Sequence, residues 1–377
     1  MLFSILSSSF RLRLKGSRFR ERDLTKVAPA TLAQFDAASS VAKPMTLTNT
    51  ALGMNFGLLS LLIAMRAGDS VRFVYGLECA YVLALQGPEP RRRAEALIEI
   101  AREIVARHED PNLKGAFLMT EAGVAYVLAK WKECIRLLDE AEDTYINHTR
   151  GTYFHAAQVR SLQLYTLWSM GEFRDLSTRC VPFLEEAEQV GDLFFSANIR
   201  TFSRPLALLA ADRPGTANDS VLSGLRAWPA PGYQLQNAMA ALILAWIAFY
   251  EGKAGRNLDF VEEQWRLIRA NHIDSFDNMR ATTLDFRCRT ALAAANRHSK
   301  TSPQRTKALK IAHECSRILD RQTNPWGRAS ARVAQAALQQ FEGNVAAAAE
   351  TFLAAAKPPT CIAAKRSGLK MDCDSNH

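Results

Sequence analysis

The feature that most constrains this chain is the period of its apolar residues, which recur at steps of three and four residues. Over windows of about 15 to 20 residues, this is the period of one face of an α-helix. Glycine and proline stand mostly between the windows, as at Gly87-Pro88, Asp110-Pro111 and Pro214-Gly215. Since no window shows the alternation typical of a strand, the pattern predicts an all-α chain of about sixteen helices, including separate helices over 30–41 and 45–66.

A layout of small and large residues repeats within the helical pattern. It is clearest in Gly123-Val-Ala-Tyr126, Lys130-Trp-Lys-Glu-Cys134, Leu138 and Ala141, returns in Gly343-Asn-Val345, Ala348, Phe352 and Ala355, and is looser in Phe173, Leu176, Cys180 and Phe183. Two antiparallel helices approach to about 8–10 Å only where small residues lie at the crossing. The large residue then fills the groove of the next pair. We therefore predict tetratricopeptide-like hairpins, stacked as an α-α superhelix.

The repeats are degenerate, because the pairs recur at about 40 residues rather than a strict 34. A HEAT-like or irregular helical array is the alternative. We predict three parts: a basic N-terminal segment or helix over 1–28, the repeat array over 29–356, and a tail over 357–377. The helical pattern stops at Pro358-Pro359, and the tail is predicted to be disordered.

Basic residues are concentrated at the start of the chain. The net charge is +9, and residues 1–26 contribute +5 through seven Lys and Arg against Glu21 and Asp23. The other 351 residues carry only +4. The high isoelectric point therefore does not indicate a basic face along the array, and we expect a solvated basic helix rather than a nucleic-acid partner.

Cysteine usage and hydropathy bear on the compartment. The seven cysteines are scattered, with no CxxC and no spacing typical of a metal site, which favours a reducing environment. The longest mainly apolar runs are Met54–Met65 and Met239–Tyr250, each of about 12 residues, whereas a membrane-spanning helix needs about 20. We expect a cytoplasmic protein with no membrane span.

Catalytic motifs are not recognisable in this sequence. It has no phosphate-binding glycine loop, no protein-kinase motif set, no HExxH and no GxSxG. We interpret the acidic cluster Glu185, Glu186 and Glu188 as a solvated helix face. The sequence thus predicts no catalytic residue, no cofactor and no metal site, and we expect a chain that is not an enzyme.

A partner-binding groove is the one site that the residues suggest. Stacked hairpins present a concave surface lined by the first helix of each pair. Polar and cationic side chains fall on those helices, and Arg and Tyr are favoured anchors at interfaces. We hypothesise a groove for an acidic or extended protein segment formed by Gln158, Tyr165, Arg200, Arg204 and Gln236. A scattered, solvated face is the alternative interpretation.

Several ordered segments resemble the C-terminal region of large bacterial eukaryotic-like serine/threonine protein kinases. They are Leu12-Arg-Leu-Lys-Gly-Ser-Arg-Phe-Arg-Glu-Arg-Asp23, Ala64-Met-Arg-Ala-Gly68, Ala122-Gly-Val-Ala-Tyr126, Lys130-Trp-Lys-Glu-Cys-Ile135 and Gly191-Asp-Leu-Phe-Phe-Ser-Ala-Asn-Ile-Arg-Thr-Phe202. In that family a kinase domain and an ATPase module precede a long tetratricopeptide-like region. Here the first segment lies close to Met1, so the resemblance implies a chain without those modules, and no catalytic residue can be carried over.

The resemblance implies a non-catalytic interaction or regulatory region related to bacterial kinase signalling. Its partner would be a protein or peptide, such as a kinase or ATPase module acting in trans. The alternative is a free-standing tetratricopeptide-type adaptor or sensor array of a transcription-regulator or signalling ATPase system.

Overall fold

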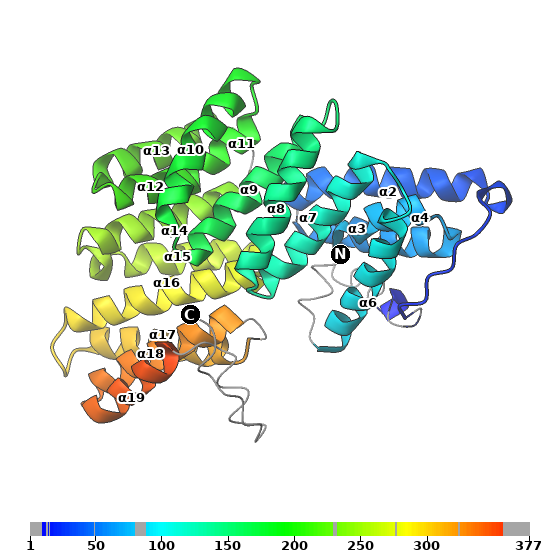
Figure 1. Ribbon diagram of the computed structural model, residues 1–377. Coiled ribbons are helices and arrows are strands. Elements are labelled where there is room, and N and C mark those ends of the chain that lie inside the picture. Colours follow the sequence, from blue (N-terminus) through cyan, green and yellow to red (C-terminus); the bar gives the residue numbers. More distant parts are fainter. Residues whose placement is uncertain are drawn as a thin grey trace, which may run out of the picture. The chain divides into compact units, whose positions relative to one another are not determined.

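The computed structural model describes residues 10–12, 14, 16–48, 50–79, 88–228, 232–275, 277–322 and 325–356. Every regular element in these ranges is helical, and none of them is a β-strand (Figure 1). The prediction of an all-α chain is confirmed. No described helix has the length and hydropathy needed to cross a membrane. The predicted tail over 357–377 lies outside the described residues.

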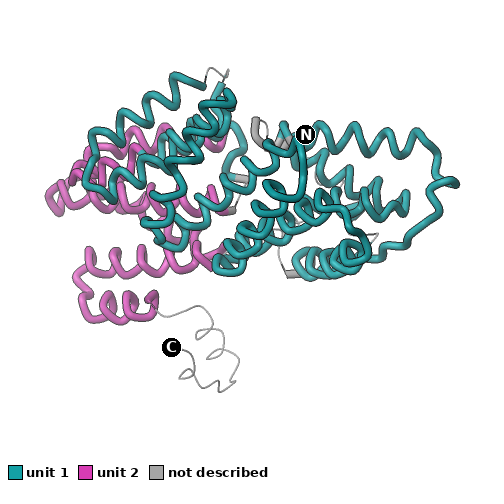
Figure 2. Tube along the Cα trace, turned by 45° about the horizontal axis from the view of Figure 1, so that its top comes forward, with its two compact units in different colours: residues 1–243, 271–275 teal, residues 244–270, 276–377 magenta. Residues whose placement is uncertain are grey.

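The chain divides into two compact units, residues 1–243 with 271–275 and residues 244–270 with 276–377 (Figure 2). The sequence predicts one array over 29–356, without this division. Unit 1 contains η1 (Leu24–Lys26), α2 (Pro29–Thr48), α3 (Thr50–Ala67), α4 (Ser70–Gly76), η2 (Leu77–Cys79), α6 (Pro88–Val105), α7 (Pro111–Val127), α8 (Trp131–Asn147), α9 (Tyr153–Met170), α10 (Phe173–Gln189), α11 (Leu193–Asn198), the π-helix η3 (Ile199–Ser203), α12 (Arg204–Ala210), α13 (Pro214–Ala227) and η5 (Ile273–Ser275).

Unit 2 begins within α14 (Leu235–Tyr250). It continues with η4 (Ala254–Arg256), α15 (Leu258–Ala270), α16 (Asp277–Asn296), α17 (Pro303–Asp320), α18 (Pro325–Phe341) and α19 (Val345–Ala356).

Consecutive helices pair as antiparallel hairpins, among them α7 with α8, α16 with α17, and α18 with α19. Several turns depend on a residue in the left-handed region, where glycine carries no steric penalty. Gly171 has φ +79° and Gly343 has φ +86°, and both lie just after the end of a helix. The hairpin fold is thus as expected, while its superhelical stacking stays a prediction.

The α7–α8 hairpin contains the core that the repeated layout predicts. Ala122 and Ala125 of α7 are buried against Cys134, Leu138 and Ala141 of α8. The looser version of the layout, in α10, is confirmed as well, because Leu176, Cys180 and Phe183 are buried in one cluster. Small residues at the helix crossing and large ones beside them therefore fill the space between the helices.

Two helical predictions are wrong in detail. A single helix, α2, runs from Pro29 to Thr48 and carries Pro44 in its interior, where the sequence predicts a break after 41. In α19 Ala348 is buried, but Phe352 is 40% exposed and does not fill a groove. The layout places Phe352 correctly on the helix, but no described helix follows α19 to cover it.

The basic N-terminal segment packs against unit 1 and is not a helix over 18–23. Leu12 is fully buried, and the Phe19 ring stacks on Phe73 of α4 with centroids 4.2 Å apart. The Arg22 N–H donates to the Gly68 carbonyl at 3.0 Å. A Cβ at Gly68 would lie 2.7 Å from the Arg20 carbonyl oxygen, so glycine there permits this close approach.

Candidate functional site

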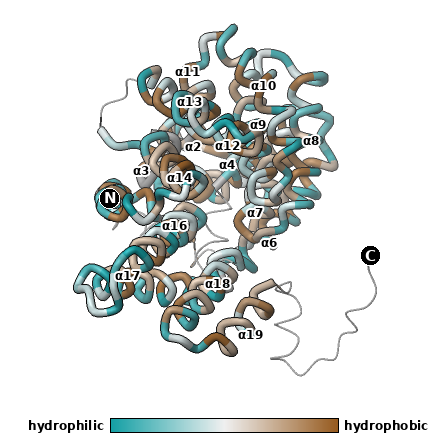
Figure 3. The backbone as a smooth tube through the Cα atoms, turned by 90° about the vertical axis from the view of Figure 1, so that its left-hand side faces the viewer, coloured by the Kyte–Doolittle hydropathy of each residue, from teal (hydrophilic) through white to brown (hydrophobic). Residues whose placement is uncertain are grey.

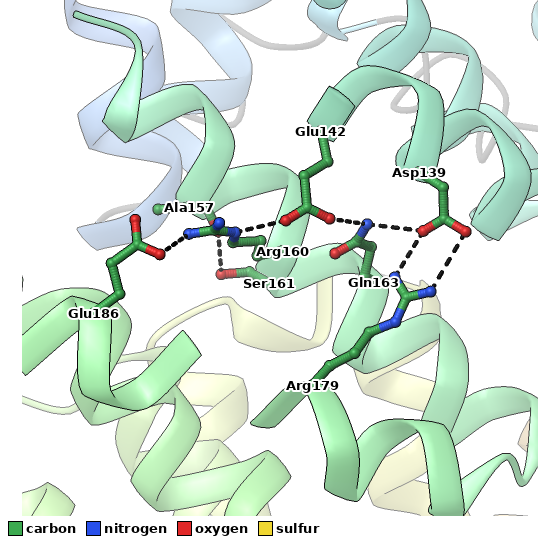
Figure 4. Close-up of polar contacts among 8 residues, drawn as sticks. All are labelled: Asp139, Glu142, Ala157, Arg160, Ser161, Gln163, Arg179 and Glu186. Carbon is green, nitrogen blue, oxygen red and sulfur yellow. Dashed lines mark hydrogen bonds and ion pairs between the residues drawn. The ribbon is translucent and has the colours of Figure 1, made fainter. Parts of the chain in front are cut away.

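A row of polar side chains crosses α8, α9 and α10 (Figure 4). Arg160 of α9 donates to Glu142 of α8 at 2.8 Å and to Glu186 of α10 at 2.6 Å. The Gln163 amide donates to Glu142 at 2.8 Å and to Asp139 at 2.9 Å. Arg179 of α10 completes the row with a 2.7 Å contact to Asp139. We call these six residues the polar ladder.

Arg160 is the more buried of the two arginines in the polar ladder. Its side chain is 9% exposed, and its guanidinium lies 4.7 Å from the centroid of the Phe183 ring. Burial alone would lower the pKa of Arg160, but the hydrogen bonds to Glu142 and Glu186 outweigh burial and raise it. The cation therefore stays charged and joins three helices.

A small pocket opens in unit 1 on the N-terminal half of α9. Its volume is about 170 Å³. One side comes from α2, one from α9 and one from the start of α11, and its lining is Pro44, Phe154, Ala157, Gln158, Ser161, Asp192, Phe194 and Phe195. Its apolar walls and few polar groups are typical of sites that hold an apolar group in a fixed orientation.

Local structure fixes the polar groups of this pocket. Asp192 is the N-cap of α11 and accepts a hydrogen bond from the Phe195 N–H at 2.9 Å. The Ser161 hydroxyl donates to the Ala157 carbonyl at 2.9 Å. Gln158 is half-buried on the same helix. Asp192 therefore supplies a carboxylate, and Gln158 an amide, at the pocket lining.

The neighbourhood of the pocket is acidic. Burial and, after it, the carboxylates of Asp192 and Glu186 together raise the pKa of Tyr153, at the start of α9, to about 12. Asp192 is the carboxylate that lines the pocket, while Glu186 is paired with Arg160. Phe154, which is 43% exposed, adds apolar surface at the same place.

Of the predicted groove residues, only Gln158 lines the pocket. Tyr165 packs edge-to-face on Phe202 with centroids 4.9 Å apart, and burial raises its pKa. Gln236 is fully buried and donates from Nε2 to Asn198 Oδ1 at 3.2 Å. Gln236 therefore serves the interior of unit 1, and Tyr165 is half-buried against Phe202.

The two predicted groove arginines are also placed differently from the hypothesis. Arg200 donates to Glu188 at 2.5 Å and to the Ser223 hydroxyl at 3.2 Å, so its charge is already neutralised. Arg204 is half-buried in α12, where its charge acts on the pKa of Cys180. The five predicted residues therefore do not form one cationic groove.

Sequence reasoning missed the polar ladder. It also took Glu186 and Glu188 for a solvated face, whereas they pair with Arg160 and Arg200. A local signal existed, because Asp139 and Glu142 are three apart on one helix. Spacing alone, however, does not reveal which cation on another helix faces them.

Four of the cysteines are buried thiols. Cys134, Cys180, Cys288 and Cys315 are free, and burial raises the pKa of the first two to about 12. Among the described residues, no group of three or more His, Cys, Asp or Glu side chains is arranged to hold a metal ion.

No protein-family model matches this chain, and a comparison with curated proteins finds no match either.

Proposed function

We propose that this chain is a non-catalytic protein-interaction region that holds one apolar side chain of a partner segment in the α9–α11 pocket. The observation that carries the proposal is the pocket itself, about 170 Å³ in volume and lined by three phenylalanines. An apolar cavity of about 150 Å³ is large enough for benzene, so this volume suits a single Leu- or Phe-sized side chain. The buried, protonated thiols of the described cysteines favour recognition over nucleophilic catalysis.

The charge beside the pocket selects the partner's chemistry. Asp192 lines the pocket, whereas Glu186, which also acts on Tyr153, is paired with Arg160. A cationic residue next to the inserted apolar side chain would meet the Asp192 carboxylate. The partner is thus basic and apolar, not the acidic segment that the sequence suggested, because Arg200 is already paired with Glu188.

The resemblance to bacterial serine/threonine protein kinases indicates which partners to test first. A kinase or ATPase module acting in trans is the first candidate, with segments that place Leu or Phe beside Lys or Arg. The chain would then be a regulatory region of such a signalling system.

The proposal is tested by selecting from a displayed library of 15-residue peptides with the full chain as bait. We expect enrichment of peptides with a Leu or Phe next to Lys or Arg. Gln158→Trp fills the pocket and should weaken the selected peptides at least tenfold, measured by fluorescence anisotropy. Glu185→Trp, on the exposed face of α10, is the matched control and should bind as the parent does. Equal binding by all three proteins would reject the pocket.

Asp192→Asn tests the role of charge separately from the role of shape. Asparagine caps helices as well as aspartate does, so α11 should be retained while the charge is lost. We expect a peptide with the cation to bind several-fold more weakly to this variant, and a peptide with Gln in place of the cation to bind equally to both proteins. An unchanged affinity for the cationic peptide would show that Asp192 does not select it.

A further inference from the structure

The largest local excess of positive charge lies in unit 2 rather than at the N-terminus. Residues 297–332 contain nine Lys and Arg against Glu314 and Asp320, a net +7 out of +9 for the whole chain. Most of these residues belong to α17 and to the turn before it. Exposed charges act over a Debye length of about 10 Å, so the local excess, rather than the net charge of the whole chain, determines the potential at this surface.

Four of these cations form a stripe along one face of α17. They are exposed and spaced at three, seven and four residues: Lys307, Lys310, Arg317 and Arg321, the last being the C-cap of the helix. At about 100° per residue they fall within an arc of about 80°, and at about 1.5 Å per residue the stripe is about 21 Å long. The opposite side of the helix carries the buried Ala308, Ala312, Cys315 and Leu319. Figure 3 shows hydrophilic residues along α17. We call the four cations the α17 stripe.

The charges of the α17 stripe are not neutralised within the described part of the chain. None of its four side chains takes part there in an ion pair or a hydrogen bond, whereas Arg287 of α16 is bound to Glu262 at 2.5 Å. Glu314, the only acid within the stripe, contacts Arg287 at 3.4 Å. The stripe therefore presents four solvated cations that a ligand can use without breaking an internal pair.

The composition of this surface distinguishes nucleic acid from protein as its ligand. Protein interfaces are depleted in lysine and anchored by apolar and aromatic groups. No large, exposed apolar side chain of the described residues lies on α17. The turn before the helix exposes Arg297, Ser299, Lys300 and Thr301, which are residue types that bind phosphate and sugar.

We propose that the α17 stripe and the turn before it bind the phosphate backbone of a nucleic acid without reading its sequence. A duplex carries about one negative charge per 1.7 Å, so each cation of a 21 Å stripe can reach a phosphate. Binding releases the counterions condensed on those phosphates. This surface is independent of the α9–α11 pocket, which lies in unit 1.

The test is titration of the full chain into a fluorescein-labelled 20-base-pair DNA duplex of arbitrary sequence, followed by anisotropy at 50, 100 and 200 mM salt. Four phosphate contacts predict a slope of about −3.6 for log K against log salt, which is a loss on the order of 100-fold across this range. The variant Lys307→Gln, Lys310→Gln, Arg317→Gln, Arg321→Gln should bind at least tenfold more weakly at 50 mM, with a much shallower slope.

A matched variant controls for overall charge. Lys132→Gln, Arg150→Gln, Arg174→Gln, Arg226→Gln removes four exposed cations from unit 1 and should bind the duplex as the parent does. Circular dichroism verifies that both variants keep their helices. The proposal is overturned if the parent does not bind at 50 mM salt, or if both variants lose affinity equally. It is also overturned if polyglutamate, or vesicles of phosphatidylcholine and phosphatidylserine, bind as tightly as the duplex, since the ligand would then be an acidic protein or a membrane.

Discussion

At the scale of single residues, burial determines whether the cysteines ionise. The thiol of Cys134 has an ordinary pKa of 9.0, which burial raises to about 12. Between these values the unfolded chain releases the proton and the folded chain keeps it, so stability falls as pH rises above 9. At pH 10 one such thiol costs about 1.4 kcal/mol.

Replacing Cys134 with alanine removes this contribution. We expect the free energy of unfolding of Cys134→Ala to fall less between pH 8 and pH 10 than that of the parent, by about 1.4 kcal/mol. Urea titrations with a reductant, followed by circular dichroism, measure the difference. Equal losses for the two proteins would mean that the thiol is not protected from ionisation.

Single residues also show what sequence reasoning can and cannot reach. The N-cap role of Asp192 is readable from the sequence, because a cap depends on neighbours within three residues. Gln236 is buried and not a groove residue, because its place depends on a distant partner, Asn198, 38 positions away in the sequence. Whether a side chain lies at the surface depends on how the hairpins pack, so the sequence of one helix does not predict it.

At the scale of helices, the polar ladder should fix how α8, α9 and α10 pack together. Arg160→Met leaves Glu142 and Glu186 without their cation and should lower the free energy of unfolding by about 3 kcal/mol. Adding Glu142→Gln removes one unpaired carboxylate and should restore at least about 1 kcal/mol. Arg136→Met, which removes an exposed cation 3.7 Å from Glu140, should cost less than about 1 kcal/mol. If the losses of unfolding free energy from Arg160→Met and Glu142→Gln simply add in the double variant, the two residues are not coupled.

The crossing of α7 and α8 depends on Gly115. A Cβ at this position would lie 2.6 Å from Tyr145 Cζ, closer than a van der Waals contact. Gly115→Ala should therefore destabilise the protein by about 1–2 kcal/mol, although alanine is the better helix former by about 1 kcal/mol. In a Tyr145→Leu background the same change should be neutral or stabilising, as measured by thermal unfolding. Destabilisation of the same size in both backgrounds would refute the steric explanation.

The same scale explains why the hairpins were predictable. Ala122, Cys134 and Leu138 meet within one hairpin, so their spacing alone specifies the contact. Phe352 obeys the same spacing but lies in the last described helix, where no described partner covers it. The repeated layout therefore predicts which residues face a neighbour but not whether that neighbour is present.

At the scale of the whole molecule, the two compact units have different surface chemistry. Unit 1 contains an apolar pocket with acidic neighbours, and unit 2 contains the α17 stripe. The sequence analysis predicts neither feature. For the stripe the reason is that residues 27–377 have a net charge of only +4, because acidic residues elsewhere in this range offset part of the +7 over 297–332. The three- and four-residue spacing of lysine and arginine in that region was a usable signal.

The central claim is that the α9–α11 pocket recognises a partner segment. Amide hydrogen exchange of the full chain, with and without a 15-residue peptide selected for Leu or Phe beside Arg, tests it most directly. We predict slower exchange in the N-terminal half of α9 and in α11, and no change when Gln158→Trp fills the pocket. Slower exchange confined to other helices, or the same protection in Gln158→Trp, would contradict the claim.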